Sequence, residues 1–217
     1  MPHQPDPLPS AGETLALFPL GTVVFPGALL PLQIFELRYL QMIGECERTG
    51  SDFVVVTLTQ GGEVHRPGGQ VEQFEAVGTR MRLERVERPH PGLLHIWCRG
   101  RERVGVQQPV QRSDGLWSAQ VKPLGAEPAV PVPAHLAYLS PQMHKALQHL
   151  GAQAHAVKAW PEPWPLDDCG WLSDRYGELL PLPVQMKYRL LALQDPMLRL
   201  ELIGDLVEPD AGHRQQS

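Results

Sequence analysis

Short apolar runs separated by proline and glycine dominate the first part of the chain. Within residues 15–40 the breaks fall at Pro19, Gly21, Pro26, Gly27 and Pro31. Because proline has no backbone N–H to donate to a sheet, each run is confined to a strand end, an edge or a bulge. The pattern therefore predicts short, bent strands that lead into a helix.

That helix is predicted from Phe35 to about Arg48 by the period of its side chains. Apolar residues recur along one face, at Phe35, Tyr39, Met42, Ile43 and Cys46. Polar and charged residues take the other face, at Arg38, Gln41, Glu45 and Arg48. Gly50 is a typical helix stop. We therefore expect Cys46, on the apolar face, to belong to the core, and the polar set to lie on the opposite, solvated face.

A β meander is predicted next. The continuous run over residues 53–58 is rich in β-branched side chains and typical of a strand buried on both faces. A glycine-rich loop over 60–75 follows. Apolar and polar residues then alternate over 77–84 and 94–99, which indicates half-buried strands. Turns at 89–92 and 113–115 separate them from a last strand over 116–121.

The pattern changes after Leu124. Residues 125–133 are rich in proline and predict a linker or strap, and the remainder is helical. One helix is predicted over 134–150, broken or bent at Pro141. Asp167 or Asp168 should cap a second that runs to about Leu180, and a third covers 184–194.

The last helix should begin at the pair Asp195 and Pro196, a cap followed by a favoured first residue. Its inward positions are predicted at Leu198, Leu202, Ile203 and Leu206, and its outward positions at Arg199, Glu201 and Asp205. We thus expect a flexible arm (1–12), a β domain (13–124), a linker (125–133), a helical domain (134–208) and a flexible tail (209–217).

Net charge, apolar run length and cysteine spacing limit the classes of partner and site that the sequence favours. Net charge is −5, which disfavours a nucleic acid or an anionic membrane as the main partner. No apolar run reaches the length of a membrane span, and the N-terminus has no signal-peptide pattern. The three cysteines have neither disulfide-framework nor metal-ligand spacing, so we expect buried, reduced thiols in a cytoplasmic protein. The histidines show no metal motif either, and we expect no metal and no cofactor.

The opening LALFPLGTVVFPGALLPLQIFELRYL closely resembles the start of the N-terminal substrate-binding domain of Lon proteases. That pattern is roughly L-x-L-F-P-L-x-x-V-x-F-P-G-x-x-L-P-L-x-I-F-E-x-R-Y. The likeness continues through Val77-Gly78-Thr79, through residues 100–104 and through 172–203, and spans about 13–207. Leu37 replaces the usual proline, and Val104 replaces the usual aromatic residue.

The resemblance implies an α+β fold: a PUA-like β-pseudobarrel with one packed helix, followed by a small C-terminal helical bundle. It also implies a role in substrate recognition. We therefore expect a stand-alone, non-catalytic module that binds apolar or unfolded polypeptide segments or acts as a protein-interaction adaptor. No phosphate-binding loop or serine–base arrangement accompanies it, so we expect neither ATPase nor peptidase activity.

Two candidate peptide-binding sites follow. The first is an apolar groove lined by Phe25, Phe35 and Tyr39, with Glu36 and Arg38 at its polar rim; the alternative for these charges is a solvated helix start, with Glu36 complementing the helix N-terminus. The second is the proline-rich segment of Trp160 and Trp164, as a lid or a strap.

Two other functions stay open at this point, and so does the oligomeric state. An enzyme with an unrecognised site would need a cleft that holds a perturbed acid or base with a partner in reach. A nucleic-acid binder would need a contiguous positive surface. The arginines of 80–88 hint at one, but Glu84 and Glu87 interrupt them and favour a solvated face.

Overall fold

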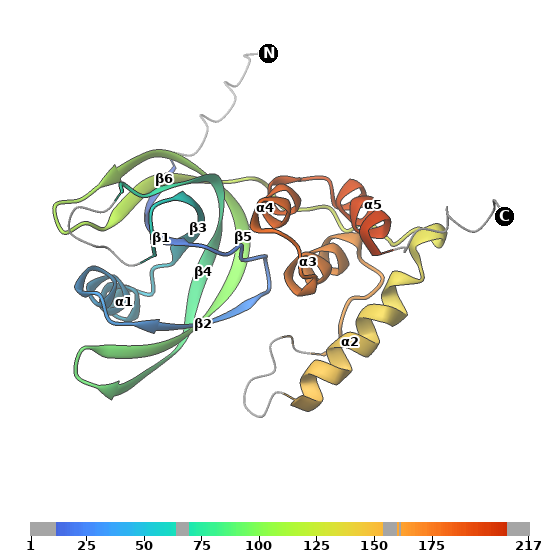
Figure 1. The fold of residues 1–217 in the computed structure, drawn as a ribbon, viewed down its shortest axis with the longest axis horizontal. Helices are drawn as coiled ribbons and strands as arrows, with labels where there is room; N and C mark the ends of the chain where they lie inside the picture. The colour runs from blue at the N-terminus through green and yellow to red at the C-terminus, as the bar shows by residue number, and fades with distance from the viewer. Residues whose placement is uncertain (1–11, 64–69, 154–159, 161, 208–217) are drawn as a thin grey trace, which may run out of the picture.

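A β barrel and a group of helices lie side by side in the computed structural model, which describes residues 12–63, 70–153, 160 and 162–207 (Figure 1). The barrel part contains β1 (Glu13–Leu20), β2 (Leu29–Ile34), α1 (Leu37–Thr49), β3 (Phe53–Gln60), β4 (Gln73–His90), β5 (Leu93–Gln111) and β6 (Trp117–Pro123). The helical part contains a short 3-10 helix (Ala134–Leu136), α2 (Leu139–Gln153), α3 (Cys169–Leu179), α4 (Val184–Ala192) and α5 (Pro196–Val207). The expected α+β fold, with one helix packed on the barrel and helices after it, is confirmed.

The sheet closes on itself through its longest strand. The strand order is β2-β5-β4-β3-β1-β6, and an additional pairing between β5 and β6 completes a ring of five strands. β1 and β3 are parallel, and the other pairs are antiparallel. β2 is an edge strand outside this ring, and within the described part of the chain it pairs only with β5. Its other edge is therefore open to an added strand.

The predicted double-sided burial of the run 53–58 is confirmed. Phe53 and Val55 lie in the barrel core together with α1, whereas Val54 and Val56 lie in a second apolar cluster between β1, β5 and β6. A strand covered on both faces needs apolar side chains at odd and even positions alike, which explains why this run does not alternate.

Helix α1 begins two residues later than predicted, and this changes the surroundings of three side chains. Glu36 is the residue before the helix and has an extended backbone, so Phe35 lies outside the helix and is exposed. Arg38, expected in solvent, is buried. The predicted stop at Gly50 is confirmed by its left-handed φ of 72°.

Pro141 does not break a helix, because it stands in the first turn of α2. The N–H groups of a first turn have no partner within their helix, so proline is tolerated there. Residues 134–136 form a separate 3-10 turn before it.

The start of α5 is as predicted, but its faces are not. The Asp195 carboxylate accepts the N–H groups of Met197 and Leu198, as a cap does. Ile203 is buried as predicted, whereas Arg199 is also fully buried. Three leucines predicted inward are exposed, namely Leu198, Leu202 and Leu206. Arg199 can be buried because it pairs with Glu127 and Asp174, two carboxylates on other segments.

Residues 125–133 run along the helical part. Val130 N–H donates to the carboxylate of Asp168 (3.2 Å), and Val132 N–H donates to the carbonyl of Asp167 (2.9 Å). Asp168 also caps α3 through the Trp171 N–H, as predicted. The proposed domain boundaries stay a prediction. Of the predicted arm (1–12), residues 1–11 lie outside the described part of the chain, and so does the whole predicted tail (209–217).

Candidate functional site

Of the three rings predicted to line one groove, Phe35 and Tyr39 border the same small hollow, whereas Phe25 lies apart from them. Phe25 has an exposed fraction of 0% and belongs to the core of the helical part. Tyr39 is buried in the core of the barrel. Phe35 remains on the surface with an exposed fraction of 56%. The opening segment thus directs Phe25 into the helical part, and Phe35 and Tyr39 remain on the barrel part.

The Phe25-Pro26-Gly27 part of the opening segment builds the junction between barrel and helices. The Phe25 ring fits against Gly177 of α3, where a Cβ would lie only 2.6 Å from the Cζ of the ring. The Pro26 carbonyl accepts a hydrogen bond from the buried Arg175 guanidinium (2.5 Å). Gly27 has a φ of 79° and leaves room for the same guanidinium, which a Cβ would approach to 2.8 Å. These residues therefore connect the barrel to the helices, and the contacts they make are with α3.

Arg38 ties the start of α1 to two loops. Its Nε donates to Glu36 (3.1 Å), its Nη2 donates to Glu72 (2.9 Å) and its Nη1 donates to the Gly115 carbonyl (2.9 Å). The second carboxylate oxygen of Glu72 accepts the Trp117 indole N–H (2.6 Å). A buried guanidinium needs such partners, because burying it unpaired is costly. The network therefore fixes the surface on which Phe35 stands.

Tyr39, the residue after Arg38, packs against both Arg38 and the barrel core. Its ring stacks on Phe18 with a centroid distance of 4.1 Å, and the Arg38 guanidinium lies 4.5 Å from its centroid. Burial raises the pKa of the Tyr39 phenol, so the ring stays neutral. Tyr39 is thus a buried core residue beneath this surface, and it forms part of the wall of the small hollow described next.

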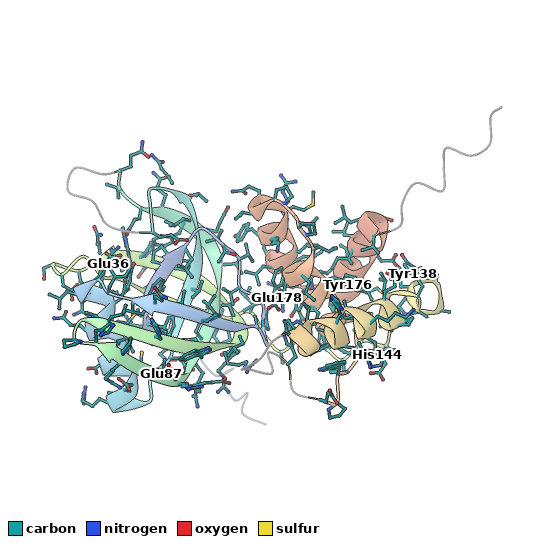
Figure 2. All side chains as sticks on the ribbon, turned by 60° about the horizontal axis from the view of Figure 1, so that its bottom comes forward. Glu36, Glu87, Tyr138, His144, Tyr176 and Glu178 are labelled. Atoms are coloured by element: carbon teal, nitrogen blue, oxygen red, sulfur yellow. The ribbon has the colours of Figure 1, made fainter. Side chains whose placement is uncertain are left out.

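A small hollow lies beside Phe35, between β2 and the end of β1. Its volume is about 90 Å³, and its lining consists of Phe18, Leu20, Leu32, Gln33, Ile34, Phe35, Glu36, Tyr39 and Glu63. We call this the Phe35 hollow. Leu37, next along the chain, has an exposed fraction of 69%. Figure 2 shows Glu36 on the side of the barrel that faces away from the helices.

The free edge of β2 next to this hollow is poor in donors. The Gly100 N–H donates to the Ala28 carbonyl (2.9 Å), and the register continues without a shift along β2 and β5. In an antiparallel pair alternate residues bond to the partner, so Leu29, Pro31 and Gln33 are directed to the free edge. Pro31 supplies a carbonyl but no N–H there. A bound segment would therefore depend on apolar contact more than on strand pairing.

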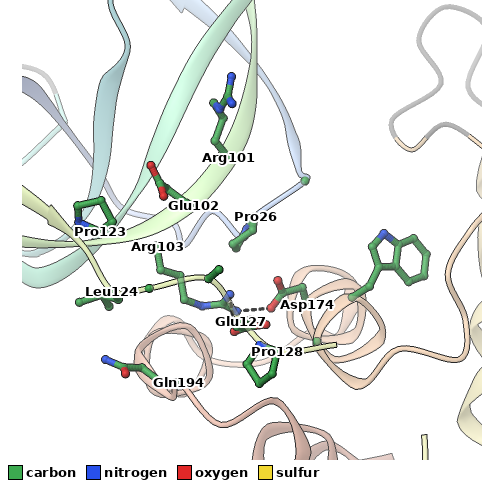
Figure 3. A pocket seen from close by; sticks show the side chains of 15 residues that line it. Pro26, Arg101, Glu102, Arg103, Pro123, Leu124, Glu127, Pro128, Asp174 and Gln194 are labelled. Atoms are coloured by element: carbon green, nitrogen blue, oxygen red, sulfur yellow. Dashed lines mark hydrogen bonds and ion pairs between the residues drawn. The ribbon is translucent and has the colours of Figure 1, made fainter. Parts of the chain in front are cut away.

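A larger cavity of about 580 Å³ lies at the junction (Figure 3). Glu127 of the strap joins two guanidinium groups across it: one oxygen lies 2.8 Å from Arg103 Nη1, and the other lies 2.8 Å from Arg199 Nη2. Arg103 also pairs with Asp174 of α3, and its Nε donates to the Leu191 carbonyl (2.9 Å). Barrel, strap and helices are thus connected through one ion-pair cluster.

Asp174 is the group in this cavity that an enzyme hypothesis would single out. Burial raises its pKa, and the charges of Arg103 and Arg199 oppose the rise. However, the carboxylate is buried between these two guanidinium groups, with Arg199 Nε at 3.4 Å. Both guanidinium groups approach the same oxygen, Oδ1, so Asp174 belongs to a buried ion-pair cluster.

Trp160 and Trp164 both lie against the helical core, away from the Phe35 hollow. The Trp164 ring meets the His144 ring edge-on at 5.6 Å, and its N–H donates to the Trp160 carbonyl (3.1 Å). The Trp160 ring lies 5.6 Å from the Arg175 guanidinium. The two tryptophans are half-buried packing residues here, while residues 154–159 and 161 lie outside the described part.

The arginines of β4 do not form a positive surface, because each is paired. Arg80 and Arg82 donate to Asp52 (2.7 and 3.0 Å), and the two at 85 and 88 pair with glutamates. Over the described residues no three metal-ligating side chains gather in one place, and no helix is long and apolar enough to span a membrane.

Sequence reasoning found Phe35, Glu36 and Tyr39 at the hollow, but it missed Glu63, which also lines the hollow, and the exposed Leu37 nearby in the chain. A signal for Leu37 was present, because an exposed leucine stands where the resembling pattern has proline. Glu63 carried no signal, since its place at the hollow depends on a hydrogen bond from the Gly21 N–H (2.6 Å), 42 residues away.

Comparisons with known proteins agree with this fold. A crystal structure of a Lon N-terminal domain protein from Xanthomonas campestris is 30% identical, with a TM-score of 0.70 over 89% of this chain and 98% of that one. The N-terminal domain of a Mycobacterium avium complex Lon protease shares the fold at 16% identity, with a TM-score of 0.57 over 89% of this chain and 97% of that one. A search of curated proteins gave no match.

A family model covers nearly the whole chain. The model of the ATP-dependent protease La (LON) substrate-binding domain matches residues 14–208, and neither an ATPase nor a protease domain is found in these 217 residues. The chain therefore belongs to the LON substrate-binding domain family.

Proposed function

We propose that this chain is a non-catalytic module that binds apolar segments of unfolded polypeptides at the Phe35 hollow. The observation that carries the proposal is the exposure of Phe35, which lines that hollow, and of Leu37, two residues later in the chain. Adjacent large apolar groups on a surface are typical of interaction sites. The family description, a substrate-binding domain, supports the same class of partner.

The surface is preorganised for such contact. Arg38 holds the start of α1 through three hydrogen bonds, and the Tyr39–Phe18 stack lies beneath it. A bound segment therefore meets apolar groups whose backbone is already fixed, which lowers the entropic cost of binding.

The size of the site limits its affinity. A phenylalanine or leucine side chain that becomes fully buried contributes roughly 1.5–3 kcal/mol. Phe35 and Leu37 are already partly covered, and a hollow of about 90 Å³ admits one side chain at most. After the cost of association, we expect a Kd of about micromolar or weaker. Weak capture suits a module that must release its partner.

The proposal includes no catalysis and a cytoplasmic location. Asp174, whose pKa burial raises, lines the junction cavity and pairs with two guanidinium groups, which supports a structural role. All three thiols are buried and free, which suits a reducing compartment. The pairing of the β4 arginines favours a protein partner over a nucleic acid.

The test is a titration of a reduced, carboxymethylated model protein, which cannot refold, against four folded variants. These are wild type, Phe35→Ser, Leu37→Ser and the matched control Val110→Ser, which removes an apolar side chain that is 61% exposed on β5. We expect Phe35→Ser to weaken binding at least about fivefold, the equivalent of roughly 1 kcal/mol. Val110→Ser should leave it within about twofold, and high salt should not abolish it.

Wild-type binding that is undetectable at about 100 µM would refute the proposal, given that affinity range. Equal binding by all four proteins would move the site, with the Trp160–Trp164 segment as the next candidate. Tyr39→Ala is unsuitable as a probe, because Tyr39 lies in the barrel core.

A further inference from the structure

The free edge of β2 carries backbone groups that have no partner strand within the described part of the chain. Because bonding alternates along an antiparallel strand, Leu30 and Leu32 bond to β5, and the residues between them are directed away from it. Pro31 agrees with this alternation, since proline is tolerated in a strand where its missing N–H would face an open edge. The edge therefore presents the carbonyls of Leu29, Pro31 and Gln33 and the N–H groups of Leu29 and Gln33.

The side chains of β2 connect this edge to the Phe35 hollow. Leu32 and Ile34 pack towards the barrel core and help to line the hollow, whereas Pro31 and Gln33 are exposed. The hollow thus lies on the inner-face side of β2. A residue of an added strand opposite Leu32 would carry its side chain on that same face, with its Cβ about 4.5–5.5 Å from the Leu32 Cβ. The edge and the hollow are therefore neighbouring parts of one surface.

We infer that the occupant of the Phe35 hollow is an extended segment that adds to β2 as a further strand, with an aromatic or large aliphatic anchor residue opposite Leu32. This inference rests on the proposed function and names the conformation and chemistry of its substrate. The backbone of the segment donates to the three edge carbonyls and accepts from Leu29 and Gln33. A helix would not match this edge, because the backbone groups along its side are already bonded within the helix.

Recognition of this kind depends on the backbone more than on the sequence. Every residue except proline offers the same N–H and C=O, so segments of many sequences can pair with β2 once one apolar anchor enters the hollow. Only alternate N–H groups of the segment face β2, because bonds and side chains alternate along a strand. In an antiparallel addition these belong to the two neighbours of the anchor, and in a parallel addition to the anchor itself.

Pro31 weakens the pairing at its centre, because one carbonyl of the segment meets no N–H there. Apolar contact therefore supplies most of the affinity, and the pairing fixes the alignment. A hydrogen bond between uncharged groups contributes about two- to tenfold in affinity. Pro31→Ala adds the missing N–H and should tighten binding by about that factor. A proline in an edge strand also limits pairing between copies of the chain.

The experiment uses a fluorescent peptide of sequence Thr-Leu-Thr-Phe-Thr-Leu-Thr and five variants, each N-methylated at one of its central residues. Anisotropy titrations against wild type should show losses of at least about threefold at every second position and changes within about twofold at the positions between. The unmodified peptide is then titrated against Pro31→Ala, which should bind more tightly. The matched control is Pro128→Ala, which changes an exposed proline of the strap and should leave the affinity unchanged.

A flat N-methylation profile on a peptide that binds would overturn the inference while leaving apolar binding intact, and so would an unchanged affinity of a folded Pro31→Ala variant. Self-association of wild type in sedimentation that Gln33→Pro abolishes would make a second copy the occupant of the edge, which also overturns it. Failure of the unmodified peptide to bind at about 100 µM would sink the proposed function and the inference with it.

Discussion

Replacement of Gly177 by alanine tests how tightly Phe25 joins the barrel to the helices. An added Cβ would lie 2.6, 2.9 and 3.2 Å from three ring carbons of Phe25. Carbon atoms in contact normally lie about 3.5–4.0 Å apart. The ring cannot withdraw to solvent, because its exposed fraction is 0%. Either α3 or the β1–β2 loop must therefore shift.

Two effects of opposite sign decide the net result. Extra atoms in a packed core destabilise by roughly 1–3 kcal/mol. Alanine in place of glycine within a helix stabilises by about 1 kcal/mol. We expect Gly177→Ala to be destabilising by about 0–2 kcal/mol in total.

Gly44 of α1 provides the matched control. It is an exposed helical glycine, and a Cβ added to it would meet nothing within 4 Å. Gly44→Ala should therefore show the helix gain alone, at most about 1 kcal/mol of added stability. The difference between the two variants, about 1–3 kcal/mol, isolates the clash with Phe25.

The assay is urea unfolding followed by circular dichroism and by tryptophan fluorescence. A double-mutant cycle with Phe25→Leu completes it, because a smaller side chain makes room for the new Cβ. The combined variant should be less unstable than the sum of the two single changes. If Gly177→Ala stabilises as much as Gly44→Ala does, or if the cycle is additive, the described fit of Phe25 into α3 is wrong.

Three further predictions concern buried charges and thiols. Glu127→Gln should lower the unfolding free energy by about 2 kcal/mol in urea titrations, because Arg103 and Arg199 lose a shared carboxylate; this is less than for a fully buried pair, since Glu127 is 24% exposed. Burial raises the pKa of Cys98 to about 12, while an unfolded thiol titrates near 8.5. Because only the unfolded chain loses this proton just above pH 8.5, the melting temperature should fall as the pH rises above about 8.5. Alkylation of Cys98 should be slow until the chain unfolds. Burial opposes ionisation of Asp52, but hydrogen bonds from two arginines lower its pKa on balance. Its contribution to the free energy of unfolding is therefore present above the unfolded pKa of about 3.9 and is lost as the pH falls below that value. The melting temperature of Asp52→Asn should decline less steeply than that of wild type from pH 5 to 2, and an identical decline would contradict this.

The sequence alone determined the elements whose causes are local. Gly50, Asp168 and the pair Asp195 and Pro196 mark helix ends through backbone conformation and capping, which involve neighbours in the chain. The run 53–58 predicted a strand buried on both faces because its side chains are apolar or β-branched at every position. The family resemblance of the opening segment likewise depended on the order of its residues.

Only the tertiary structure decided which charges and rings are buried. The period of α1 and α5 placed Arg38 and Arg199 in solvent, and both are buried because carboxylates from distant segments reach them, Glu72 in one case and Glu127 in the other. The separation of Phe25 from Phe35 and the approach of Glu63 to the hollow have the same origin. Ion pairs and ring contacts between residues far apart in the chain depend on how the strands and helices pack, and hydrophobic periodicity within one element carries no information about them.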